Sequence, residues 1–210
     1  MRLQSFSSFV VVAALAGTSA GCGEYVQDQG RSPSQVVIQS LEGARGNTPE
    51  EFGTPLVSDV ETVVTTPEPC SSTAPCRTVF GDVGQVTMSI ILKDPGAPGV
   101  TSSPSTLNAV TFNRYRVEYR RPDNRNVPGV DVPFPIDSAT TFTVPGTSTV
   151  TAGFELVRNA AKREAPLRGL VGGGQQLSMI ADVTFYGRDQ AGNDVTARGS
   201  IGVEFGDFLP

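Results

Sequence analysis

Apolar and polar side chains alternate with a period of two along several stretches of this chain. In 85–94 one face carries the apolar residues Val86, Met88, Ile90 and Leu92. The segments 177–185 and 195–205 repeat the pattern. Successive side chains of a β-strand point to opposite faces of the sheet, so this period is typical of strands with one buried and one wet face. We therefore expect antiparallel sheets that pack around a core.

The last two of these segments flank the sequence RDQAGND, which predicts a hairpin loop. Gly192 and Asn193 tolerate the positive φ angles of such loops, so we expect a long antiparallel hairpin over 177–207. Further strands are expected where short apolar runs stand between Gly, Pro, Asn and Asp, at 35–41, 56–64, 77–80, 109–120, 140–144 and 149–156. This spacing favours an all-β sandwich over an α/β sheet.

Two short segments favour helix instead. In PEEF, 49–52, Thr48 is a suitable cap and Pro49 stands at the first helical position, which predicts about one turn. The sequence VRNAAKREAPL, 157–167, consists largely of helix-forming residues until Pro166 interrupts it. We expect no other helix in the folded part.

Composition sets the size of the core. The chain has 210 residues, of which 38% are hydrophobic, and this is enough for one sizeable core in a single domain. Its 23 Gly and 16 Pro make it rich in turns without reaching the level of a disordered sequence. The formal net charge of −5 gives no support for binding to nucleic acid.

The N-terminus has the pattern of an export signal. Arg2 precedes the apolar run FVVVAALA at 9–16, and small residues follow. The run is too short to span a bilayer as a permanent anchor. The next residues, SAGC, end at Cys22 and resemble the lipobox of bacterial lipoproteins, with Ser19 where that family usually has Leu or Val.

The resemblance to lipoproteins implies a processed, lipid-anchored protein. In that family the signal peptide, here 1–21, is removed and the cysteine, here Cys22, is acylated, so a membrane is an expected partner. Residues 22–34 would be the lipidated cysteine and a flexible tether, and 35–210 the folded domain. Gly23 in place of Asp after the cysteine favours the outer membrane of the cell envelope. Secretion without acylation and an unprocessed, cytoplasmic N-terminus are the alternatives.

The other two cysteines, Cys70 and Cys76, lie close together in PCSSTAPCR. In an oxidising compartment such an even pair favours a local disulfide. A metal site would need further His or Cys ligands, and a redox pair is usually a C-x-x-C in an α/β pattern. A structural disulfide is therefore the preferred interpretation.

Two segments resemble parts of immunoglobulin-like domains such as fibronectin type III. RYRVEYRRPDNRNVPGVDVPFPID, 114–137, looks like a central strand that runs into a Pro-rich connection. VTFYGRDQAGNDVTARGSIGVEF, 183–205, resembles the closing hairpin of bacterial Ig-like modules. The resemblance implies an Ig-like antiparallel β-sandwich with one or two short helical insertions. The Trp and the inter-sheet disulfide of antibody-type domains are missing from this chain.

Most catalytic chemistries lack their residues in this sequence. With no His, a Ser-His-Asp or Cys-His site cannot form, and no S-x-x-K motif is present. Carboxylates that could in principle form a glycosidase pair are Glu118, Asp131, Glu155, Asp182 and Glu204. Most of them fall on the polar side of alternating strands, which is typical of a solvated face. We expect no enzyme activity, no catalytic residues and no cofactor.

Two loops invite a ligand-binding interpretation. VGGGQQ, 171–176, lacks the Lys-Ser/Thr of a phosphate-binding loop and precedes a strand, so we interpret it as a connection. In DQAGND the side chains of Asp189, Asn193 and Asp194 could offer oxygen ligands to Ca²⁺. Such residues are also usual in any tight turn, and we predict no metal site.

The most unusual local feature is a basic and aromatic strand. It contains five arginines, Arg114, Arg116, Arg120, Arg121 and Arg125. On a strand Tyr115, Val117 and Tyr119 face one side, and Arg114, Arg116, Glu118 and Arg120 face the other. In one interpretation the tyrosines fill the core and the arginines cover a solvated face, with Glu118 as an ion-pair partner. In the other, the arginines form a recognition strip for an anionic partner.

These observations leave two classes of function. The first is a non-catalytic, membrane-tethered module for interaction or assembly at the cell envelope, whose partner is another envelope protein. The second is a ligand-binding module for a glycan or another anionic ligand, with the arginine-rich strand 114–125 as its site. An exposed row of Tyr115, Tyr119, Tyr186 or Phe134 would favour the second class, and burial of all four would disfavour it.

Overall fold

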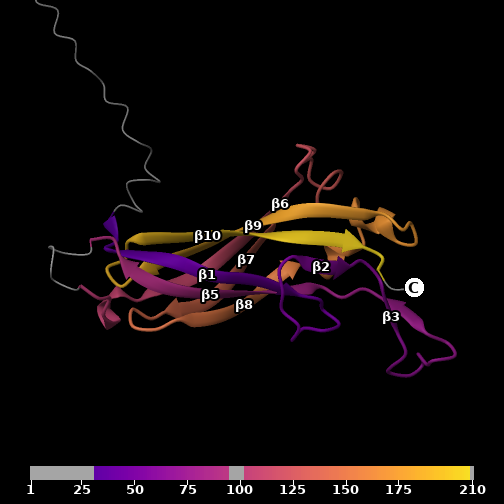
Figure 1. The fold of residues 1–210 in the computed structure, drawn as a ribbon, viewed down its shortest axis with the longest axis horizontal. Coiled ribbons are helices and arrows are strands. Elements are labelled where there is room, and N and C mark those ends of the chain that lie inside the picture. Colours follow the sequence, from indigo (N-terminus) through magenta and orange to yellow (C-terminus); the bar gives the residue numbers. More distant parts are fainter. Residues whose placement is uncertain (1–30, 95–101, 209–210) are drawn as a thin grey trace, which may run out of the picture.

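The computed structural model describes residues 31–94 and 102–208. The fold is mostly β and sandwich-like, with two larger layers that twist along a common long axis and a small two-stranded sheet at one end (Figure 1). Cys22 and the segment 1–21 lie outside the described residues, and so does most of 22–34. Among the described residues no helix is long and apolar enough to cross a membrane.

The smaller of the two main layers has three strands. In it β1 (Ser34–Ala44) and β8 (Val150–Val157) flank β5 (Asp82–Leu92), and both pairings are antiparallel. Strand β5 alternates as the sequence predicts, because Val86, Met88 and Ile90 are buried and the residues between them are partly exposed. In β1 the register shifts after Ile38, which interrupts strict alternation along that strand.

The larger layer has five strands in the order β2 (Leu56–Asp59), β10 (Asp194–Gly206), β9 (Gln176–Asp189), β6 (Val110–Arg120) and β7 (Ile136–Val144). Its pairings are antiparallel except that β2 runs parallel to β10. The predicted hairpin over 177–207 is confirmed as β9 and β10. Gly192 takes a φ of 86° in its turn, whereas Asn193 keeps a negative φ.

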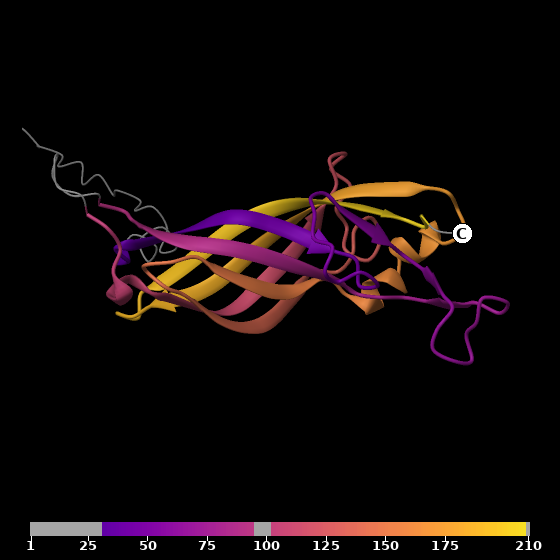
Figure 2. The same ribbon diagram turned by 60° about the horizontal axis from the view of Figure 1, so that its bottom comes forward.

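Short elements complete the chain. β3 (Thr62–Val64) pairs with β4 (Cys76–Thr78) in a separate hairpin that projects beyond one end of the sheets (Figure 2). The helical elements are η1 (Thr106–Asn108), α2 (Asn159–Lys162) and η2 (Leu167–Leu170). The predicted helical segment 157–167 is thus reduced to one turn of α-helix and the start of a 3₁₀ turn, because Pro166 cannot continue the first helix.

Three predicted elements differ from the structure. The segment 49–52 forms a hydrogen-bonded turn in which Glu51 donates to the Thr48 carbonyl, but no helix. The single strand expected at 56–64 is split into β2 and β3, which belong to different sheets. β7 begins at Ile136 rather than Thr140, because residues 136–139 continue the antiparallel pairing with residues 114–117 of β6.

The inner faces of the two layers share one core. Phe185 of β9 lies at its centre and contacts four other rings, those of Phe112, Tyr115, Phe142 and Phe154, at centroid distances of 6.1, 6.2, 5.9 and 5.3 Å. Phe154 belongs to the three-stranded layer, so these ring contacts join the layers directly. Edge and tilted ring arrangements of this kind add to the stabilisation from burial.

A bulge in β8 is bridged by two tyrosines of the opposite layer. Glu155 pairs with Val83 and Val157 with Asp82, so the register passes over Leu156. The Tyr119 hydroxyl donates to the Leu156 carbonyl at 2.5 Å, and the Tyr115 hydroxyl accepts from the Glu155 amide at 3.2 Å. The two phenols therefore satisfy backbone groups at the irregular point of the ladder.

Candidate functional site

The arginine-rich strand is divided by the alternation of β6. Tyr115, Val117 and Tyr119 point into the core and are at most 6% exposed. Arg114 and Arg120 stand on the outer face of the five-stranded sheet, and Arg116 is half-buried beside them. The division of the strand into a core side and an arginine side is confirmed. Of the four aromatic residues named as a possible binding surface, Tyr115 and Tyr119 are buried, Tyr186 is half-buried, and Phe134 is exposed.

The outer face of β6 is a ladder of ion pairs. Arg114 binds both carboxylate oxygens of Asp137 on β7 and stacks on the Tyr186 ring, 5.0 Å from its centroid. Arg116 lies 2.8 Å from Glu118 and 3.7 Å from Asp137. On the other side Arg120 contacts Asp182 of β9 at 2.6 Å. The sequence predicted Glu118 as a partner; Asp137 and Asp182 become partners through the strand register.

The ladder changes the acidity of its carboxylates. The hydrogen bond from Arg114, with the charge of the guanidinium, holds the pKa of Asp137 below its ordinary value. The Arg114 guanidinium has its pKa raised by the same contact. An anionic ligand at this face would therefore compete with carboxylates that already occupy the guanidinium forks.

The last two arginines belong to the connection between β6 and β7. Arg121 contacts Asp123 at 2.5 Å, and Arg125 contacts Asp131 at 2.9 Å. Each of the five predicted arginines thus has a carboxylate partner within the fold. They lie on one strand and its adjoining loop, but they do not converge on a common pocket among those lined by described residues.

The connection 121–135, which we call the β6–β7 loop, carries exposed apolar side chains. Val127, Val130 and Phe134 are 56%, 65% and 57% exposed. The loop projects from the sheets in both views, on the half of the molecule away from the start of β1 (Figures 1 and 2). Loop tips are usually polar, so three exposed apolar residues on one loop are unusual.

The β6–β7 loop is held in one conformation by its own hydrogen bonds. The Val127 carbonyl accepts from the amides of Val130, Asp131 and Val132 at 3.1, 2.8 and 3.3 Å. The nearly buried Asp131 carboxylate accepts from the Val127 amide at 3.3 Å and from Arg125. Val132 is 2% exposed and belongs to the core, so it anchors the loop to the sandwich.

Glycine makes the tip of the loop possible. Gly129 has a φ of 77°, a conformation that residues with a side chain rarely adopt. A Cβ at this position would stand 2.5 Å from the Phe134 ring, so the ring packs directly on the glycine. Sequence reasoning treated 121–135 mainly as a Pro-rich connection. The composition of the loop could have indicated its exposed apolar residues, because the sequence VPGVDVPF is apolar where a connecting loop is usually polar.

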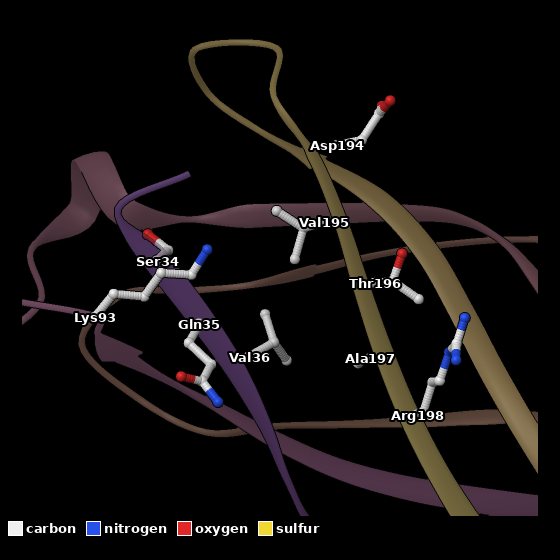
Figure 3. Close-up of a pocket in the computed structure, with 9 residues that line it drawn as sticks. All are labelled: Ser34, Gln35, Val36, Lys93, Asp194, Val195, Thr196, Ala197 and Arg198. Carbon is white, nitrogen blue, oxygen red and sulfur yellow. The ribbon is translucent and has the colours of Figure 1, made fainter. Parts of the chain in front are cut away.

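A groove of about 370 Å³ opens between the first residues of β1 and β10 (Figure 3). One wall is formed by Ser34, Gln35 and Val36, and the other by residues 194–198. Among the pairings of the described residues, β10 is bonded along 194–202 to β9 alone and β1 is bonded along 34–42 to β5 alone. The groove therefore lies between two sheet edges. Lys93, Asp194 and Arg198 border it, and Asp194 lies 2.9 Å from Arg188.

The remaining residues singled out in the sequence stabilise local structure in the described part of the chain. Cys70 and Cys76 form a disulfide within the β3–β4 hairpin, between its connecting loop and the first residue of β4, as predicted. The Asp189 carboxylate accepts from the amides of Ala191 and Asn193 at 2.9 Å and so closes its own turn. Within 31–94 and 102–208 no cluster of His, Cys, Asp and Glu could hold a metal ion.

Comparisons with protein-family models, with curated proteins and with solved structures find no match to this chain.

Proposed function

We propose that this protein is an exported, lipid-anchored Ig-like β-sandwich that works as a non-catalytic interaction module of the cell envelope, with the β6–β7 loop as its recognition element. One observation carries the proposal: a loop fixed in a single conformation exposes Val127, Val130 and Phe134 together. The partner is another envelope protein with an apolar pocket.

The rigidity of the loop is the reason to assign it this role. Binding costs conformational entropy whenever a flexible loop must be ordered, and this cost is reduced when the loop is ordered beforehand. The Asp131 carboxylate and the Val127 carbonyl supply that order. Small apolar clusters with an aromatic anchor are the usual centres of protein interfaces, and a polar rim surrounds them. Arg121 and Arg125 with their carboxylate partners would provide the rim.

The envelope location rests on three further points. The lipobox-like SAGC at Cys22 suggests acylation and a membrane anchor. The disulfide between Cys70 and Cys76 suits an oxidising compartment. The chain enters the sandwich at the start of β1, and the β6–β7 loop projects sideways from the other half, so the loop of a tethered molecule would lie at a distance from its anchor (Figure 1).

Site-specific photo-crosslinking in the envelope of cells that make the full chain tests the proposal. A photoreactive amino acid at Val130 or at Phe134 is expected to give the same discrete adduct. Leu107 is the matched control, because it is 77% exposed and apolar but lies on η1, outside the loop. The adduct should disappear in Asp131→Ala, which removes the acceptor that fixes the loop. Equal adducts from position 107, or none from 130 and 134, would count against this function.

A further inference from the structure

The strongest unexplained feature of the molecule is a buried ion pair between Lys162 and Asp82. The Lys162 Nζ lies 2.8 Å from the Asp82 Oδ1, and each side chain is 1% exposed. Lys162 ends α2, whereas Asp82 begins β5. Neither residue belongs to the β6–β7 loop or to the arginine face, and lysine is rarely buried so completely.

The surroundings of this pair disfavour charge. Removing an ammonium and a carboxylate from water is costly, and the mutual attraction of the pair often fails to offset this cost. Burial lowers the pKa of Lys162, although the nearby Asp82 partly opposes that effect. A neutral amine is therefore more accessible at this position than at an exposed lysine.

We propose that Lys162 and Asp82 form an intramolecular isopeptide bond between the Lys162 Nζ and the Asp82 Cγ. A proton moves from the ammonium to the carboxylate, the resulting amine attacks Cγ, and a C–N bond forms. One Cγ–O bond breaks. Two of the three ammonium protons leave with that oxygen as water, and the third remains on the amide nitrogen. The positive and negative charges cancel, so the step needs no oxidant, reductant or further reactant.

The hydrogen-bond partners of the pair fit this reaction. The Gly46 amide donates to Oδ1 at 3.1 Å, where it would stabilise negative charge on the retained oxygen during attack. The Ser58 hydroxyl donates to Oδ2 at 2.6 Å, which makes Oδ2 the oxygen positioned to leave. Both donors come from segments other than those of the reacting residues and are therefore fixed independently by the fold.

The same partners fit the product. The amide oxygen would keep the hydrogen bond from Gly46. The remaining amide hydrogen would keep the bond to the Asp59 carbonyl, which now accepts from the Lys162 Nζ at 2.8 Å. A neutral amide with both polar groups satisfied replaces two buried charges, so the site loses their desolvation cost, while the buried Ser58 hydroxyl has to turn to a new acceptor when Oδ2 leaves.

Proximity supplies the driving force for a reaction that free amines and carboxylates do not undergo in water. Groups held in contact react with effective molarities of about 10⁵ M or more. Here α2, β5 and the end of β2 hold the pair in contact, and burial limits access of water to the amide. The bond would tie α2 covalently to β5, across 80 residues of sequence.

Intact-mass measurement of the purified, folded full chain tests the inference. The wild-type mass should be lower than that of the disulfide-bonded sequence by one water molecule. Trypsin should release the peptide 78–93 joined to 159–163, because the modified Lys162 is no longer cleaved. A folded, disulfide-bonded protein with no loss of water, together with a free 159–162 peptide, would overturn the proposal.

Two lysine variants distinguish the Lys162–Asp82 isopeptide bond from other reactions that lower the mass by one water molecule. Lys162→Met should regain the full mass, and Lys93→Met should keep the reduced mass, because Lys93 is an exposed lysine outside the pair. After denaturation, an amine-reactive label should modify Lys93 of the wild type but not Lys162. Labelling of Lys162 in denatured wild type contradicts the bond, and this readout does not depend on whether Lys162→Met folds.

Discussion

The Tyr119 hydroxyl donates a 2.5 Å hydrogen bond to the Leu156 carbonyl and so connects the five-stranded layer to the bulge of the three-stranded layer. Tyr119 is 6% exposed, and burial raises the pKa of its phenol far above the ordinary value. The hydroxyl therefore stays protonated and remains a donor at neutral pH.

Tyr119→Phe should destabilise the protein by about 1–3 kcal/mol, because it leaves a buried carbonyl acceptor without its donor while keeping the ring. Equilibrium unfolding in urea measures this change. Tyr115→Phe is the matched control, since the Tyr115 hydroxyl makes a longer bond of 3.2 Å to the same strand, and its loss should cost less. Equal or larger destabilisation by Tyr115→Phe would contradict the assigned importance of the Tyr119 bond.

Arg114→Gln should raise the pKa of Asp137 toward its ordinary value, because the fork that holds the carboxylate is removed. In the wild type the folded pKa is depressed, so Asp137 contributes stability above the unfolded value of about 3.8, and this contribution is lost as pH falls through the folded pKa. The free energy of unfolding of the variant should therefore fall less steeply than that of the wild type as the pH is lowered through the acid range.

Titration of the Asp137 carboxyl by NMR gives the pKa directly. Arg188→Gln is the control, because Arg188 pairs with Asp194 elsewhere on the sheet and should leave Asp137 unchanged. An unchanged pKa in Arg114→Gln would show that the ion pair is not maintained in solution.

Gly129→Ala should open the tip of the β6–β7 loop. The substitution raises the free energy of the folded state by about 1–2 kcal/mol, because a residue with a Cβ must take the positive φ of this position. It also places a Cβ against the Phe134 ring. Limited proteolysis should therefore cut within 121–135 faster than in the wild type.

A second glycine separates the two effects. Gly192 has a φ of 86° but has no atom within 4 Å of an added Cβ, so Gly192→Ala carries the backbone cost alone. Equal destabilisation by both substitutions would mean that the Phe134 contact contributes nothing to the loop.

Reduction of the disulfide should loosen the β3–β4 hairpin before the sandwich unfolds. The bridge closes a short loop, and its loss should cost that loop about 2 kcal/mol. Because β3 and β4 pair only with each other among the described strands, hydrogen exchange should accelerate at Val63 and Val64 and remain slow at Val183 in the core. Equal acceleration at Val183 would show that the hairpin and the core unfold together.

Much of the sheet could be predicted from local pattern. The alternation in β5, β9 and β10 fixed which residues face the core, because a strand has only two faces. The loop RDQAGND identified the hairpin, since Gly192 supplies the one positive φ that the turn requires. The same rule predicted that the side chains of Tyr115 and Tyr119 point into the core.

The ion-pair partners and the burial of Lys162 could not be predicted, because both depend on contacts between residues far apart in the sequence. Asp137 and Asp182 neutralise arginines of β6 only because strand register brings them opposite, and no local rule relates them to Arg114 or Arg120. Lys162 lies in a polar run that is typical of a solvated helix. Its burial results from packing against β2 and β5, whose residues are about 80 to 100 positions away.

The direction of β1 has a mechanical consequence. β1 starts where the described chain enters the sandwich and runs toward the half from which the β6–β7 loop projects (Figure 1). When the molecule is pulled between those two points, the force acts along β1, and its antiparallel hydrogen bonds to β5 lie across that direction. They are loaded together in shear instead of opening one after another. A module held at one end and gripped at the other would therefore resist extension until the whole strand slides.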